Sequence, residues 1–514
     1  MICIGAGRFT DLAQRNRYDA SYTIFCIFAN IPSTKRAINR NYKGYDSMRP
    51  LLKTTCKTIS SSIILLALNL RFTCAFLFYA GYTAALLPRG CAIAELLCYL
   101  LLLYIQIFPT LSTRKISSSR NKILEDGTAL LQLFLATTIL ETGYSLAILA
   151  LSLSDMSGRT GTVPLSFITW LRHLLPVFLV ELTLFWNGIL RVYLTSVQLG
   201  IRWRVIGIIC GFIPVIHIYV LCRIIHITSN EVQWENEKHL LDQVRAENLE
   251  CRTRYPVLLV HGVFFRDFRF FNYWGRIPAE LKRNGAVLFY GGQQSAASVA
   301  ECGRELAGRI QQILTGTGCD KVNIIAHSKG GLDSRYAVAK CGAAPYVASL
   351  TTINTPHRGC IFADYLLDKI PDGICRSVAA RYNAALKRFG DSDPDFMEAV
   401  QDLTASSCAR LNELLPDDPQ VYYQSVGTRM HHAAGGRFPL NMSYPLVKHF
   451  DGECDGLVSL DSMKWGSHFI CPDVPGSRGI SHGDMIDLNR ENIPGFDVRE
   501  FYVKLVHDLK ERGF

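Results

Sequence analysis

The 17 cysteines of this chain include no C-x-x-C pair and no other spacing that is typical of metal ligands. Structural zinc sites depend on such closely spaced ligands, so the sequence argues against a zinc site. Nine of the cysteines follow residue 250, and an odd number does not imply a complete disulfide framework in that half. One or two bridges there remain compatible with the sequence.

Charged residues are also scarce, at 19% of the 514 residues, whereas 49% are hydrophobic. This composition is too apolar for an all-soluble protein, and the length exceeds that of one typical domain. The formal net charge is +10, but the lysines and arginines are scattered, and their densest cluster lies before the first apolar segment. We therefore expect no nucleic-acid partner and interpret the charge as a sign of membrane topology.

Residues 1–58 form a basic extension with ten Lys or Arg against three Asp or Glu. They lack a sustained apolar run followed by a small-residue cleavage site, so no cleavable signal peptide is evident. Met48 stands just before Arg49, Lys53 and Lys57, which would flank a first membrane segment. The sequence is compatible with a disordered extension or with a start at Met48.

Residues 59–228 are apolar in blocks that are long enough for membrane spans of roughly 17 to 25 residues. Five spans are predicted, at residues 72–88, 91–111, 128–153, 172–198 and 204–225. The alternative is a set of buried helices in a large soluble domain, but five such blocks in succession favour a membrane region. Four polar residues inside the spans should face the bundle interior or one another, in a functional or a structural role. They are Glu141, Glu181, Asn187 and Arg191.

The basic loops predict an orientation for these spans. Residues 114–122 carry four Lys or Arg between the second and third spans, and Arg202 and Arg204 lie between the fourth and fifth. Such loops are typically cytoplasmic. Five spans that start inside would place everything after residue 228 outside the cell membrane, and a count that is wrong by one reverses this.

Residues 229–254 are abruptly polar with apolar residues at roughly helical spacing, which predicts a helical connector. From residue 255 to 514, short apolar runs alternate with helical patterns. Strands are predicted at 256–260, 286–290, 322–326, 347–353 and 421–426, and helices at 299–314, 332–340 and 498–512. This β/α alternation favours a mostly parallel sheet covered by helices on both faces.

Residues 322–331 read V-N-I-I-A-H-S-K-G-G, an apolar strand followed by a tight turn and a helix start. That is the pattern of a nucleophile elbow with Ser328 at its tip. The strained turn needs small neighbours, which Ala326 and Gly330 provide, although Ala326 departs mildly from the G-x-S-x-G form. An ordinary Ser/Gly turn is the alternative.

A nucleophilic serine needs an adjacent base, and that base needs an orienting carboxylate. His482 in R-G-I-S-H-G-D-M and Asp455 in D-G-E-C-D-G-L-V-S supply the two, in the chain order Ser, Asp, His of α/β-hydrolases. Three other carboxylates compete with Asp455. They are Asp451, Asp461 and Asp484.

The tetrahedral intermediate of such a reaction needs backbone N–H donors aimed at its oxyanion. The strand L-L-V-H-G-V at 258–263 ends so that the amide of Val263 can pair with the amide of Lys329, the residue after the nucleophile. We interpret His261 in this strand as a loop-shaping residue rather than as a second base.

Five segments resemble the bacterial triacylglycerol lipases of the α/β-hydrolase fold, and they occur in the same order. They are L-L-V-H-G-V-F-F, A-H-S-K-G-G, T-I-N-T-P-H-R-G, C-D-G-L-V-S and S-H-G-D-M. The resemblance covers about residues 255–514. It implies Ser328 as nucleophile, His482 as base and Asp455 as orienting acid, with Val263 and Lys329 as oxyanion amides.

The resemblance also implies a structural calcium ion at Asp484, two residues after the catalytic histidine. The second Asp ligand has no match in residues 435–448, and Cys454 stands where the family commonly has Asn. Beyond this possible calcium ion, no cofactor is expected.

The sequence as a whole predicts a membrane-anchored serine hydrolase that cleaves carboxylic esters, above all acyl esters of lipids. Two alternatives on the same triad are an acyltransferase and a phospholipase. A third, from another class, is a non-catalytic membrane interaction or transport protein, which would have no need of a triad with an oxyanion segment. Residues 360–403 mix amphipathic helix with Pro, Gly and Asp clusters and form either a lid or a static helical layer.

Overall fold

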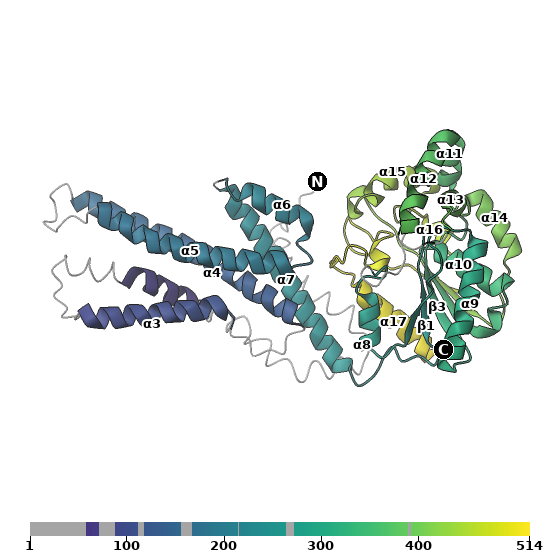
Figure 1. Cartoon of the computed structure of the whole chain (residues 1–514), viewed down its shortest axis with the longest axis horizontal. Coiled ribbons are helices and arrows are strands. Elements are labelled where there is room, and N and C mark those ends of the chain that lie inside the picture. The colour runs from purple at the N-terminus through teal and green to yellow at the C-terminus, as the bar shows by residue number, and fades with distance from the viewer. Residues whose placement is uncertain are drawn as a thin grey trace, which may run out of the picture. The chain divides into compact units, whose positions relative to one another are not determined.

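The computed structural model describes residues 58–70, 88–110, 118–155, 167–213, 215–263, 272–388, 391 and 393–514 (Figure 1). The chain divides into two compact units, Met1–His239 and Leu240–Phe514, which we call the helical unit and the α/β unit. The division falls within the predicted connector. Nearly all of the predicted extension 1–58 and the predicted span 72–88 lie outside the described residues, except for Thr58 and for the last residue of that span.

The α/β unit is built on a six-stranded sheet in which all neighbouring strands are parallel, in the order β2-β1-β3-β4-β5-β6. The strands are β1 (Val257–Val260), β2 (Leu288–Tyr290), β3 (Val322–His327), β4 (Val347–Ile353), β5 (Tyr422–Val426) and β6 (His468–Ile470). Because all the strands are parallel, their carboxyl ends meet at one edge of the sheet, and so do the loops that follow them.

Alternate side chains of β1 enter two different cores. Val257 and Leu259 pack in one cluster with residues of α8 (Ile277–Arg283) and α17 (Val498–Glu511). Leu258 and Val260 pack in the other, with residues of α9 (Val299–Thr317) and α10 (Lys329–Lys340). Figure 1 shows α8 and α17 on one side of the strands and α9 and α10 on the other. The structure therefore has the predicted parallel sheet with helices on both faces.

The five predicted strands are all present, each within two residues of its predicted bounds. The sixth strand, β6, was not predicted, because its three residues are half-buried or exposed and form no apolar run. The other helices of this unit lie after β4 or after β5. They are α11 (Ile361–Lys369), α12 (Asp372–Arg388), α13 (Phe396–Gln401), α14 (Ala405–Leu414), α15 (Leu440–Asp451) and α16 (Leu460–Met463).

The helical unit is centred on two long helices that lie side by side, α4 (Ser119–Asp155) and α5 (Phe167–Thr195) (Figure 1). They run antiparallel, because Gly127 of α4 contacts Gly188 of α5, whereas further along Thr138 donates a hydrogen bond to Glu181. A Cβ at Gly127 would lie 2.7 Å from Cβ of Arg191, so glycine allows the close approach of the helices. The other helices are Thr58–Leu70, α3 (Pro88–Ile107), α6 (Gly200–Cys210) and α7 (Ile216–Arg245).

The polar residues of the predicted spans lie inside this bundle, as the sequence predicts. Glu141 and Glu181 are buried, and Glu141 accepts a hydrogen bond from Asn69. Asn187 donates to the Gln106 carbonyl oxygen at 2.9 Å. Many large apolar side chains of α4 and α5 point outward instead. They include Ile139, Leu140, Leu146, Leu171, Leu175, Phe178, Leu179 and Leu190.

The prediction of five spans is wrong for the described residues, in which two helices are long and apolar enough to cross a membrane. These are Ser119–Ala150 and His173–Thr195, which match the predicted spans 128–153 and 172–198. The predicted span 204–225 is divided between α6 and α7, because the first helix ends at Cys210 and the second begins at Ile216. The apolar part of α3, Leu96–Ile107, is shorter than a span.

Helix α7 folds back on α6, which returns the chain to the end of the bundle that holds the start of α4 and the end of α5. A Cβ at Gly207 of α6 would lie 3.1 Å from Ile224 of α7. Further along α7, the buried Glu231 carboxylate accepts hydrogen bonds from Arg120 at 2.8 Å and from the amide of Val197 at 3.0 Å. The start of α4, the end of α5 and residue 231 are therefore at one end of the helical unit.

Candidate active site

Ser328 lies between β3 and α10 with φ 55° and ψ −131°, so it is the non-glycine residue at the tip of a strained turn. Such a conformation costs of order 1 to 3 kcal/mol and persists where its neighbours hold it. The Ser328 amide donates to the Ile353 carbonyl oxygen at 2.9 Å, and Thr355 donates to the Ser328 carbonyl oxygen at 2.8 Å. A Cβ at Gly330 would lie 2.3 Å from the His261 carbonyl oxygen, which explains why this neighbour is glycine.

Asp455 and His482 are brought together from the loops that follow β5 and β6. Asp455 Oδ2 lies 2.6 Å from His482 Nδ1, and the Asp455 side chain is fully buried. The amides of Leu457 and Val458 donate to the other carboxylate oxygen at 2.9 and 2.8 Å. A carboxylate oxygen in the position of Oδ2 accepts the proton of His482 Nδ1, and this hydrogen bond leaves Nε2 able to accept a proton.

The three competing carboxylates have other partners. Asp451 accepts hydrogen bonds from the amides of Ile361 and Phe362, and Asp461 pairs with Lys464 at the surface. Asp484 pairs with Arg478, with Nη1 to Oδ2 at 2.8 Å. The structure thus brings Asp455 to His482, and it places these three carboxylates in other contacts.

The His482 ring and the predicted oxyanion segment both lie close to Ser328. The His482 ring lies against the ring of His327, the residue before Ser328, with 4.5 Å between the centroids. A Cβ at Gly262 would lie 2.8 Å from Ser328 Cβ, so the predicted oxyanion segment reaches the serine. The described hydrogen bonds do not join Ser328 Oγ to His482, a contact that in many hydrolases tightens only when substrate binds.

The two predicted oxyanion residues follow Ser328 itself and Gly262, the glycine that packs against the serine. Val263 follows Gly262 and packs against Ala296, Leu386 and Ala399. Lys329 is the first residue of α10, where backbone N–H groups have no partner within the helix. His261, which we interpreted as shaping this loop, is fully buried, and both of its ring nitrogens lie close to backbone carbonyl oxygens.

The side chain of Lys329 has a structural role that the sequence did not indicate. It is buried, and its Nζ lies 2.7 Å from Asp333 Oδ1 and 3.4 Å from Cys302 Sγ of α9. Burial raises the pKa of Asp333 to about 7 and the pKa of Cys302 to about 12, although Lys329 opposes both shifts. The cluster ties the first turn of α10, and with it the elbow, to α9, and Cys302 stays an unreactive thiol.

Asn354 is a second residue that the sequence analysis missed. Its side chain Nδ2 donates to Asp455 Oδ2 at 2.8 Å, so it supports the oxygen that also faces His482. It sits after β4 with φ 48° and is fully buried. The sequence did contain a signal for this residue. In the segment T-I-N-T-P, an Asn, a residue type that tolerates positive φ, stands at the end of a predicted strand.

Two buried histidines should make the α/β unit sensitive to acid. Burial is the main cause that holds the pKa values of His327 and His357 well below the usual range, so both are neutral in the folded chain. The unfolded chain binds their protons below a pH of about 6.5, so folding loses up to about 1.4 kcal/mol per pH unit for each. Thermal melting of the solubilised chain should show a midpoint that falls between pH 7 and pH 5. His357→Asn should reduce that fall, and an equal fall in both chains would contradict this account.

Two clusters of carboxylates are candidate metal sites. Asp242, Glu280 and Glu500 gather in the α/β unit, but Arg245 lies among them with N to O distances of 2.6 to 3.0 Å. At Asp484, the Arg478 guanidinium also contacts Glu491 at 3.1 Å. In both places an arginine already occupies carboxylate oxygens that would have to bind the ion, so neither donor set fits a divalent cation.

The predicted lid lies in α11, α12 and α13. Along α12, Ile374, Val378 and Tyr382 recur every four residues and are all exposed, whereas Ala379 and Leu386 are buried. Between α12 and α13, Asp391 accepts hydrogen bonds from Ser295, which holds this part of the segment. Movement of this segment stays a prediction.

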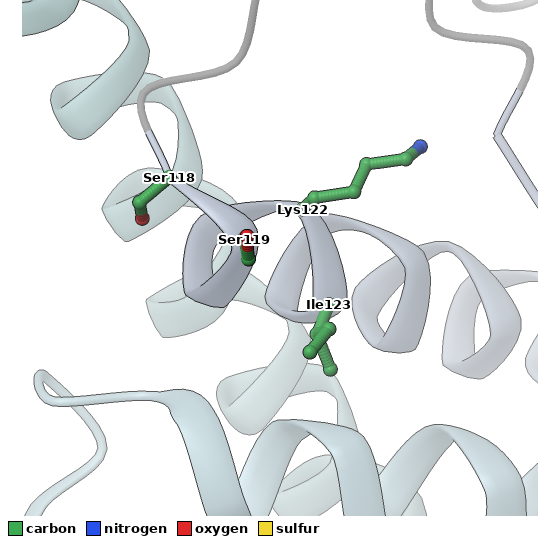
Figure 2. Close-up of a pocket in the computed structure, with 4 residues that line it drawn as sticks. All are labelled: Ser118, Ser119, Lys122 and Ile123. Atoms are coloured by element: carbon green, nitrogen blue, oxygen red, sulfur yellow. The ribbon is translucent and has the colours of Figure 1, made fainter.

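The pocket in Figure 2 lies elsewhere, at the start of α4 in the helical unit. Its lining residues are Ser118, Ser119, Lys122 and Ile123. None of the predicted catalytic residues lines it.

The chain has relatives of known name, although no protein-family model matches it. It is 38% identical over 184 residues to a triacylglycerol lipase of Burkholderia plantarii, covering 33% of this chain and 51% of that protein. Against this relative and one from Pseudarthrobacter phenanthrenivorans, the chain spans about half the length. It is 30% identical over 237 residues to a triacylglycerol lipase of Vibrio cholerae, covering 42% of this chain and 75% of that protein. Among solved structures, the Staphylococcus hyicus lipase has 17% identity and a TM-score of 0.40, covering 51% of this chain and 98% of that one.

Proposed function

Because the chain belongs to the triacylglycerol lipase family, we propose that it hydrolyses carboxylic esters of lipids through an acyl-serine intermediate. The observation that carries the proposal is the buried pair of His482 and Asp455 beside the strained Ser328. An ordinary turn needs neither the strain nor a buried histidine and carboxylate beside it.

In the proposed reaction, Ser328 Oγ attacks the ester carbonyl carbon while His482 Nε2 takes its proton. Asp455 stabilises the imidazolium through Nδ1, and the amides of Val263 and Lys329 stabilise the oxyanion. His482 then gives its proton to the departing alkoxide, which leaves as the alcohol. Water attacks the acyl-serine by the same route in reverse and releases the fatty acid.

The exposed row on α12 supports a lipid substrate rather than a dissolved ester. Ile374, Val378 and Tyr382 form one exposed apolar stripe, and the basic residue Arg381, three positions after Val378, lies beside it. A stripe of this kind suits contact with a lipid surface.

The substrate proposal is tested by comparing long-chain triacylglycerol emulsions with dissolved short-chain esters. The purified chain should release free fatty acid from the emulsion, and Ser328→Ala should abolish the release. Activity confined to dissolved esters would contradict a lipid substrate. Transfer of the acyl group to an added alcohol without release of free acid would show that the reaction is acyl transfer and not hydrolysis.

We further propose that α4 and α5 anchor the chain in a bilayer. Their outward-facing leucine, isoleucine and phenylalanine side chains, with Glu141 and Glu181 turned inward, are the arrangement expected in lipid. The bilayer would then be the enzyme's partner as well as the place where its substrate gathers.

The structure of the helical unit favours the cytoplasmic side for the α/β unit, opposite to the side that five spans implied. Glu231 holds the outgoing helix α7 to Arg120 and Val197, and Arg204 donates to the Ser196 carbonyl oxygen at the same end of the helical unit. These basic residues are expected on the cytoplasmic side whatever the span count. Within the part of the chain that the structure describes, the eight cysteines from Cys302 to Cys471 form no disulfide, which fits a reducing compartment.

Protease digestion of cells tests this placement. The α/β unit should stay intact in whole cells and be cleaved once the plasma membrane alone is opened. Cleavage in whole cells would place it outside, and protection in both samples, with a cytoplasmic control digested, would place it in an internal lumen.

We also propose that the α/β unit needs no calcium ion at Asp484, because Arg478 occupies its carboxylate. A chelator should leave the melting temperature and the activity unchanged. Arg478→Gln should cost about 1 to 3 kcal/mol, less than a fully buried pair because the Arg478 side chain is 24% exposed. A melting temperature that drops with chelator and recovers with added calcium would contradict the proposal.

A further inference from the structure

One hydroxyl group links the parts of the site that the proposed reaction needs. Tyr273 Oη accepts a hydrogen bond from the Gly262 amide at 3.0 Å and lies 2.7 Å from His327 Nδ1. Both partners of the hydroxyl are next to the reacting groups, because Gly262 precedes Val263 and His327 precedes Ser328. Tyr273 and His327 are buried, so water does not compete for these bonds.

The Gly262 amide can only donate, so it uses a lone pair of the hydroxyl oxygen. The contact with His327 Nδ1 is a hydrogen bond whichever ring nitrogen carries the proton, because a hydroxyl group can donate as well as accept. Burial and then the neighbouring His482 keep the pKa of His327 well below its usual range, so no second positive charge lies beside the catalytic imidazole.

The two hydrogen-bond partners of the Tyr273 hydroxyl each lie against a different part of the site, the oxyanion segment and the catalytic histidine. Gly262 lies so close to Ser328 that a Cβ would come within 2.8 Å of the serine Cβ, and the next amide is the oxyanion donor Val263. The His327 ring lies 4.5 Å from the His482 ring between centroids, at an angle of 57°. A shift of either partner would move an oxyanion donor or the base relative to Ser328.

We propose that Tyr273 is a positioning residue, whose hydroxyl holds the oxyanion segment and the catalytic histidine in register with Ser328. The role rests on the proposed ester hydrolysis. Removal of an oxyanion donor costs about 10² to 10³ in kcat, and displacement of one costs less. Tyr273→Phe should therefore lower kcat by about 10- to 100-fold while KM changes little, because the ground-state contacts of the substrate are kept.

The test compares Tyr273→Phe with Tyr423→Phe in the purified full-length chain. Tyr423 is a matched control, since its buried hydroxyl also accepts a backbone N–H, that of Asp418 at 3.0 Å, near the opposite end of β5 from the site. For each variant we would measure kcat and KM on a short-chain ester, inhibition by an alkyl boronic acid and the melting temperature. The boronic acid forms a tetrahedral adduct on serine, so its affinity should fall with kcat in Tyr273→Phe alone.

Two results would overturn the role. One is a Tyr273→Phe enzyme whose kcat and boronic acid affinity stay within about twofold of wild type, below the cost of a displaced oxyanion donor. The other is an equal loss of kcat in Tyr423→Phe, which would make the effect one of stability. A wild-type chain that neither cleaves esters nor binds the boronic acid would overturn the proposed function and this role together, whereas an active wild type with an unaffected Tyr273→Phe overturns the role alone.

Discussion

Replacing Ser328 by alanine is expected to lower kcat for ester hydrolysis by about 10⁴- to 10⁶-fold, because the triad acts as a unit. The fold should tolerate the change, since the substitution removes one oxygen atom and Ser328 contributes its backbone, not its side chain, to the hydrogen bonds that hold the elbow. Alanine keeps the positive φ strain of the serine. The measurement is fatty acid release by wild type and variant at equal concentration.

Ser349→Ala is the matched control for this variant. Its hydroxyl is buried on β4 and donates to Asn323 at 2.8 Å, so the substitution removes a buried hydroxyl far from the strand ends that carry the site. It should cost about 1 kcal/mol of stability and leave kcat intact. Substantial hydrolysis by Ser328→Ala, or an equal loss in Ser349→Ala, would contradict the mechanism.

Asp455→Asn is expected to lower kcat by about 10⁴-fold, because asparagine presents an amide N–H where His482 Nδ1–H needs an acceptor. From the sequence, a neighbouring carboxylate seemed able to take over this role. The structure gives no such neighbour, since Asp451, Asp461 and Asp484 have partners of their own among the described residues. Steady-state kinetics of the purified variant measures the loss.

Asp451→Asn is the matched control here, because it changes a carboxylate a few residues away that accepts the amides of Ile361 and Phe362. Its kcat should stay within about threefold of wild type, since it touches none of the reacting groups. A loss below tenfold in Asp455→Asn, or a severe loss in Asp451→Asn, would mean that another carboxylate orients His482.

The sheet and the elbow could be predicted because their signals are local. The strands β1, β3 and β4 are apolar runs bounded by turn residues, and Gly330 marks the tight turn after Ser328. The strand β6 could not be predicted, because its three residues are held by pairing with β5 and not by an apolar pattern of their own.

The supporting residues of the site could not be predicted, because their contacts join segments that are far apart in the sequence. Tyr273 meets His327 across 54 positions, and Lys329 meets Cys302 across 27. A lysine and a cysteine carry no pattern that pairs them before the chain is folded. The contact of Lys329 with Cys302 depends on the packing of α10 on α9, which only the tertiary structure defines.

For the described residues, the span count was wrong because hydropathy measures composition and not continuity. The predicted span 204–225 is mostly apolar, yet its helix stops at Cys210, and the sequence there contains Gly211 and Pro214, which both disfavour a continuous helix. Fold-back of α6 on α7 then buries apolar residues such as Leu221 and Ile224 against protein.

Labelling with a fluorophosphonate tests the central claim most directly, because this reagent bonds only to a serine oxygen that a neighbouring base has activated. The full-length chain would be treated, digested and mapped by mass spectrometry, with Ser328→Ala and His482→Ala as parallel samples. The account predicts one label, on the peptide that contains Ser328, and none in either variant. A label on another residue, or ester hydrolysis by a chain whose Ser328 stays unlabelled, would contradict it.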